Sequence, residues 1–73
     1  MDFQTPSSSL IRIDTVEEMI GLCRSTIYNL MNEKSPYFDP TFPKRVRLSP
    51  NGRAVAWCKA EVQAWIDSRL MAR

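Results

Sequence analysis

The 73-residue chain contains no histidine, only two cysteines and only two glycines. Without histidine it lacks the commonest general base and the commonest zinc ligand. It also lacks a glycine-rich phosphate loop and paired carboxylates on rigid elements. A domain of this size has little room for a ligand pocket of about 300 Å³ or more. We therefore expect no catalytic residues, no bound cofactor and no metal site.

Cys23 and Cys58 are too few for a disulfide framework or a zinc site. In a reducing compartment both are expected to be free thiols. No apolar run approaches the roughly 18 residues that are needed to span a bilayer. The first ten residues have neither the positive segment nor the apolar segment of a signal peptide. The sequence thus predicts a cytoplasmic protein without a membrane partner.

Positive charge is concentrated in one segment, although the net charge is only +2. Residues 40–60 contain no acid and the following basic residues: Lys44, Arg45, Arg47, Arg53 and Lys59. A run of one charge sign is often only a solvated face. Its concentration nevertheless makes an anionic partner worth considering.

Residues 1–9 are predicted to form a flexible arm, and residues 10–73 a single domain. The first helix of this domain is expected in the first third of the chain. Asp14 and Thr15 are each followed three residues later by a glutamate, and Thr15 with Glu18 matches a capping box. Gly21 can adopt the left-handed conformation that often ends a helix. The helix is therefore expected to begin at residue 14 or 15 and to end at Gly21.

A second helix is expected over about residues 24–34, with Ile27, Leu30 and Met31 on its inner face. Helix, glycine-containing turn and helix follow one another within residues 14–34. This is the shape of a helix-turn-helix.

Residues 35–43 contain three prolines and predict a loop whose aromatic side chains, Tyr37, Phe38 and Phe42, fold back on the core. Residues 44–57 predict a β-hairpin around an Asn-Gly turn. Its alternation places Val46 and Leu48 inward and the arginines outward.

The last helix is expected from residues 58–60 to about residue 71. Its core stripe would consist of Val62, Trp65, Ile66 and Leu70, with Trp65 packed against Trp57. The fold class is α+β and mostly helical: a winged helix-turn-helix with a two-stranded β-hairpin wing and a C-terminal helix.

In such a fold the second helix enters the major groove of DNA and reads base edges near its N-terminus. Arg24 suits guanine and Asn29 suits adenine, because both can make bidentate hydrogen bonds. The candidate DNA-binding residues of this helix are Arg24, Ser25, Thr26, Tyr28 and Asn29. Taken alone, this set could also be the polar face of an ordinary amphipathic helix.

The hairpin would clamp the neighbouring backbone or minor groove. Its candidate residues are Lys44, Arg45, Arg47, Asn51 and Arg53. The plainer interpretation is a charged face that protects an edge strand from aggregation.

The same segments resemble the AlpA family of prophage regulatory proteins over roughly residues 10–70. The resemblance is carried by Arg24-Ser25-Thr26-Ile27-Tyr28, Phe42-Pro43-Lys44, Gly52-Arg53-Ala54-Val55-Ala56-Trp57 and Glu61-Val62-Gln63-Ala64-Trp65-Ile66. It implies a MerR-like winged helix, with Ser25, Thr26 and Tyr28 in the recognition motif and Arg53 in the wing motif. Cys23 and Cys58 depart from the usual Ser at two helix caps, so weaker caps are expected.

The resulting hypothesis is a sequence-specific regulator of a prophage or integrative element that binds double-stranded DNA, with self-association on repeated sites as a possible feature. One alternative is an excisionase-type architectural factor for site-specific recombination. Another is a small protein-interaction module anchored by the loop aromatics.

Overall fold

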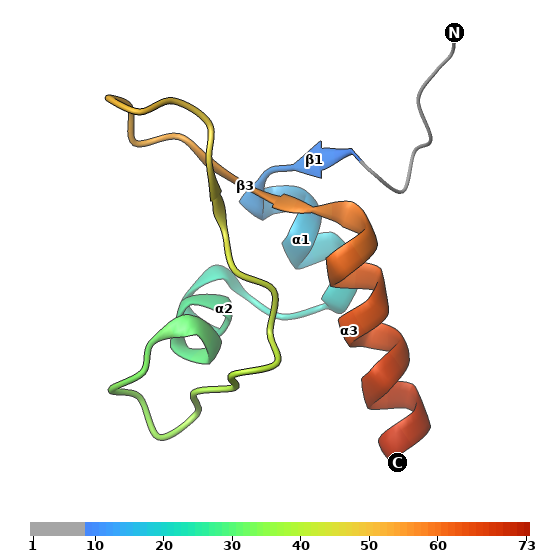
Figure 1. Cartoon of the computed structure of the whole chain (residues 1–73). Coiled ribbons are helices and arrows are strands. Elements are labelled where there is room, and N and C mark those ends of the chain that lie inside the picture. Colours follow the sequence, from blue (N-terminus) through green and yellow to red (C-terminus); the bar gives the residue numbers. More distant parts are fainter. Residues whose placement is uncertain (1–8) are drawn as a thin grey trace, which may run out of the picture.

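The computed structural model describes residues 9–73 (Figure 1). In chain order its elements are β1 (Leu10–Ile11), α1 (Ile13–Ile20), α2 (Arg24–Met31), β2 (Val46–Arg47), β3 (Val55–Cys58) and α3 (Lys59–Ala72). This order confirms the α+β, mostly helical class. Residues 1–8 of the expected arm lie outside the described residues, and the carbonyl of Ser9 accepts a 2.8 Å hydrogen bond from the Lys59 N–H.

The sheet has three antiparallel strands in the order β1-β3-β2. β3 pairs on one edge with β1, where Ile11 lies opposite Trp57, and on the other edge with β2. The two strands of the expected hairpin are therefore joined by a third, formed by the extended stretch that precedes the first helix. The chain between β2 and β3 projects away from the helices (Figure 1).

The three helices, the loop before β2 and strand β3 each contribute one side chain to the buried hydrophobic cluster. The five residues are Val16, Ile27, Phe42, Trp57 and Val62. Burial of one such side chain contributes about 1.5–3 kcal/mol, so a domain this small depends on every one of them. The expected inner residues of α1 and α2, among them Met19 and Leu30, pack around this cluster.

α1 begins at Ile13, so the expected capping box at Thr15 is wrong. The carbonyl of Arg12 already accepts hydrogen bonds from the N–H groups of Thr15 and Val16, both at 3.1 Å. Thr15 therefore lies inside the first turn, because the chain passes directly from β1 into the helix. The end at Gly21 is confirmed: its φ is 74°, and its N–H donates to the Glu17 carbonyl at 2.8 Å.

α2 ends at Met31, earlier than the expected residue 34. The Asn32 side chain accepts a 3.0 Å hydrogen bond from the Lys34 N–H. Such local bonds offer the backbone an alternative to the helix. The carbonyl of Leu30, left free by the early end, accepts the N–H of Asp39 at 2.9 Å.

The loop aromatics do not behave alike. Phe42 is buried in the core, whereas Tyr37 is 68% and Phe38 36% exposed. The prediction that all three fold back is wrong for Tyr37. Burial of Phe42 also removes it as an anchor for a protein-interaction module.

α3 has the expected bounds, but its expected core stripe is only partly correct. Val62 is buried, and Trp65 and Ile66 pack against the core. Leu70 is 53% exposed, because the helix continues past the end of the core. The ring of Trp65 meets Phe42 edge to face, with centroids 5.0 Å apart, a contact that the sequence did not predict.

Candidate nucleic-acid interface

The outer face of α2 presents most of the expected base-reading residues to solvent. Arg24, Ser25, Tyr28 and Asn29 are exposed, while Thr26 is half-buried. Ile27 is fully buried and fixes the helix to the core from the opposite side. The helix therefore has one anchored face and one free polar face.

Cys23 forms the N-cap of α2, and its side chain makes no capping hydrogen bond to the backbone. Its Sγ instead lies 3.4 Å from the Ser25 hydroxyl and 3.2 Å from the Thr26 hydroxyl. Hydrogen bonds from Ser25 and then Thr26 lower the pKa of Cys23 to about 7. Cys58, the N-cap of α3, likewise makes no side-chain capping bond, and both cysteines are free thiols.

Arg47 lies on the face of the sheet that is turned toward the core. Val46 pairs with Ala56, and Arg47 pairs with Val55. Because directly opposed residues share a face of the sheet, Arg47 shares the face of Val55, which packs against the core. Val46 and Leu48 lie on the opposite face and are 40% and 44% exposed.

The expected inward orientation of Val46 and Leu48 is therefore wrong. A slip of one residue moves every side chain of a strand to the other face. β2 has only two residues, too few to enforce its own alternation. The buried residues before it, Phe42 and Pro43, fill the core in its place.

This register brings four candidate residues together around one groove between α2 and the hairpin. The groove is lined by Tyr28, Arg45, Arg47, Gly52, Arg53 and Val55. Its polar part thus consists of a phenol from α2 and three guanidinium groups from the hairpin. Such a groove suits a polyanion, because each guanidinium can pair with a phosphate.

The other candidates lie outside this groove. Lys44 lines a neighbouring hollow on the side of α3, together with Glu61 and Ser68. Asn51 is exposed in the hairpin turn, which the Gly52 N–H closes on the Ser49 carbonyl at 3.3 Å. The turn therefore forms over the expected residues 49–52, with Pro50 and Asn51 in its middle and no positive φ at either residue.

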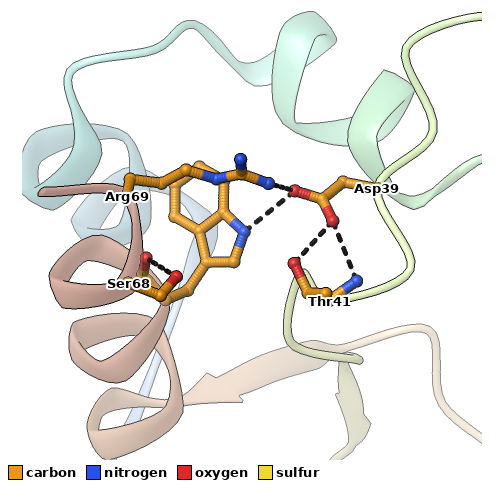
Figure 2. A network of polar contacts seen from close by, with 5 residues as sticks. Asp39, Thr41, Ser68 and Arg69 are labelled. Carbon is orange, nitrogen blue, oxygen red and sulfur yellow. Dashed lines mark hydrogen bonds and ion pairs between the residues drawn. The ribbon is translucent and has the colours of Figure 1, made fainter. Parts of the chain in front are cut away.

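Sequence reasoning missed Asp39, whose carboxylate joins the loop to α3 (Figure 2). One oxygen accepts the Thr41 N–H at 2.9 Å and the Thr41 hydroxyl at 2.6 Å. The other accepts the Trp65 indole N–H at 3.1 Å and also the Arg69 guanidinium. Asp-Pro-Thr is a recognisable Asx-turn pattern, but the bonds to α3 span 26 and 30 residues and leave no local signal.

The environment of Asp39 favours its charged form. Burial by itself raises the pKa of the carboxyl, but the hydrogen bonds from Thr41, Trp65 and Arg69 outweigh it and lower the pKa to about 2. Arg69 also lies over the Trp65 ring, 5.1 Å from its centroid. The carboxylate therefore stays ionised at neutral pH and holds all four donors.

Within residues 9–73 no cluster of three or more His, Cys, Asp or Glu side chains could hold a metal ion. Over the same part of the chain, every helix is too short or too polar to cross a membrane.

The sequence profile of the family described as "Prophage CP4-57 regulatory protein (AlpA)" matches residues 9–70. The chain is 38% identical over 60 residues to the DNA-binding transcriptional activator AlpA of Escherichia coli K12, which covers 82% of this chain and 83% of that protein. It is also 38% identical over 63 residues to the uncharacterized protein ORF88 of Enterobacteria phage P4, covering 86% of this chain and 62% of that protein. No solved structure gives a significant match.

Proposed function

Because this chain belongs to the family of AlpA prophage regulatory proteins, we propose that it is a sequence-specific DNA-binding transcription regulator of a prophage or integrative element. α2 enters the major groove, and the hairpin of residues 44–57 contacts the adjacent backbone or minor groove. The name of the Escherichia coli relative supports transcription regulation. Duplex DNA is the partner that this role requires.

The observation that carries the proposal is the groove between Tyr28 and the three hairpin arginines, Arg45, Arg47 and Arg53. The major groove is about 12 Å wide and admits an α-helix, whose diameter with side chains is about 10–12 Å. With α2 in that groove, the arginines lie beside it and can neutralise the flanking phosphates. The Tyr28 hydroxyl can donate to a phosphate at the same edge.

Base reading is assigned to the exposed N-terminal part of α2. Arg24 and Asn29 can each make paired hydrogen bonds with a purine. Ser25 and Thr26 supply hydroxyl groups beside Cys23, at the end of the helix whose dipole favours anions. Lys44 and Asn51 are assigned to outer backbone contacts, because they lie outside the groove.

The test is selection of preferred sites from a random duplex pool, followed by fluorescence anisotropy on a selected and an unrelated duplex. Binding should be tighter on the selected duplex. For either duplex, a plot of log affinity against log salt should have a slope of about −3 to −4 if the three groove arginines and Lys44 each neutralise one phosphate. Absence of a preferred site, or a slope near zero, would contradict the proposal.

A further inference from the structure

Asp39 connects three parts of the molecule through separate groups. Its backbone N–H donates to Leu30 in the last turn of α2 at 2.9 Å, and its carbonyl accepts the Phe42 N–H at 3.1 Å. Its carboxylate binds Trp65 and Arg69 of α3. One loop residue thereby fixes the end of α2 and the loop before β2 to the same helix.

The chain from Asp39 to the hairpin is short and anchored. Phe42 and Pro43 are buried, and Phe42 packs edge to face against Trp65, the ring whose N–H binds Asp39. Lys44 and Arg45 follow immediately. The location of the first hairpin arginines relative to α2 therefore depends on Asp39 and Phe42 on one side and on the short pairing of β2 with β3 on the other.

We infer that Asp39 is a positioning residue for DNA binding: its contacts with α3 hold the hairpin arginines beside α2 so that both bind one duplex together. This inference rests on the proposed function. Asp39 contacts DNA through neither carboxylate oxygen, because both are occupied by donors of the chain. Its effect on DNA is exerted through Arg45 and Arg47.

The sign of the effect separates positioning from simple electrostatics. Removal of any negative charge reduces repulsion of phosphates and by itself strengthens DNA binding. Asp39→Asn removes one negative charge and replaces one accepting oxygen by an NH2 group. This NH2 group cannot accept hydrogen bonds from the donors that it faces, so half of the network around the side chain is lost. Asp67→Asn removes the same charge from α3, where the carboxylate is exposed and accepts only a 3.1 Å bond from Gln63 among the described residues.

The experiment measures duplex affinity and salt slope for the full chain and for both variants. We expect Asp39→Asn to bind about tenfold more weakly than Asp67→Asn, with a slope shallower by about two, because Arg45 and Arg47 no longer reach phosphates together. Equal affinities and equal slopes for the two variants would overturn the inference. Failure of the unmodified chain to bind would overturn the proposed function instead.

Thr41→Val provides a second variant that keeps every charge and removes only the hydroxyl donor of Thr41. Circular dichroism at the assay temperature establishes that each variant is folded. If Asp39→Asn does not fold, Thr41→Val decides: a loss of affinity of about threefold with a shallower slope supports positioning. Unchanged affinity and slope in folded Thr41→Val would then contradict it.

Discussion

The guanidinium of Arg24, the first residue of α2, lies 3.5 Å from the carboxylate of Glu17 in α1. The two side chains are 56% and 28% exposed. A pair this exposed contributes at most about 1 kcal/mol to stability. Its more important effect is to restrict the directions in which Arg24 can point before it meets DNA.

Arg24→Ala should cost about 1–3 kcal/mol of binding free energy on the preferred duplex and relax the preference at one base pair. Anisotropy on preferred and random duplexes measures both quantities. An equal loss on the two duplexes would identify Arg24 as a phosphate contact.

Glu17→Gln should raise affinity for random DNA and reduce discrimination, because it removes a nearby negative charge and frees the Arg24 side chain. Glu18→Gln is the matched control, since Glu18 carries the same charge on the same helix but is exposed and forms no ion pair among the described residues. Identical discrimination ratios for the two variants would show that the ion pair has no role in recognition.

Arg47→Ala and Arg53→Ala should each weaken binding to all sequences about equally and make the salt slope shallower by about one. Arg73→Ala is the matched control, because Figure 1 shows the C-terminal end of α3 on the opposite side of the molecule from the hairpin turn. Slopes that stay unchanged in both hairpin variants would exclude the hairpin from the interface.

Trp65→Ala should unfold the chain. Truncation of a large aromatic side chain in the core costs about 3–5 kcal/mol; Trp65 is partly buried against the core, and a domain of this size holds only about 3–5 kcal/mol in total. The substitution removes the edge-to-face contact with Phe42 and the bond to Asp39 together. Far-ultraviolet circular dichroism is the measurement; a variant with native helicity and melting temperature would show that Trp65 is not part of the core.

Ionisation of Asp39 should make the stability of the fold depend on pH in the acidic range. Its folded-state pKa of about 2 lies below the usual 3.8, so the carboxylate stabilises the fold above about pH 4, and this contribution is lost as pH falls toward 2. The melting temperature of Asp39→Asn, measured from pH 2 to pH 6, should therefore vary less with pH than that of Asp67→Asn. Parallel profiles for the two variants would contradict the assignment.

The sequence predicted the helices and the exposed face of α2 because these depend on local patterns. Ile27, Leu30 and Met31 recur at helical spacing, and Gly21 supplies the left-handed residue that ends α1. The resemblance to the AlpA family was confirmed by the match over residues 9–70. The assignment of individual residues to DNA contacts stays a prediction.

The orientation of β2 and the role of Asp39 could not be predicted from local patterns. The alternation of Val46 and Leu48 with arginines fits either orientation of the strand. Only the pairing of Arg47 with Val55 shows which residues face the core. The α3 partners of Asp39 are a matter of tertiary packing. In both cases the decisive contact joins residues from two different segments, and the sequence pattern of either segment alone does not indicate it.

The distribution of the core along the chain has a consequence for synthesis on the ribosome. The buried cluster draws on residues from Val16 to Val62, and β1 at the start of the domain pairs with β3 near its end. An N-terminal part of the chain that ends before Val62 therefore lacks part of the buried cluster. The nascent chain therefore finishes folding only after Val62 has emerged, so folding follows translation of nearly the whole domain.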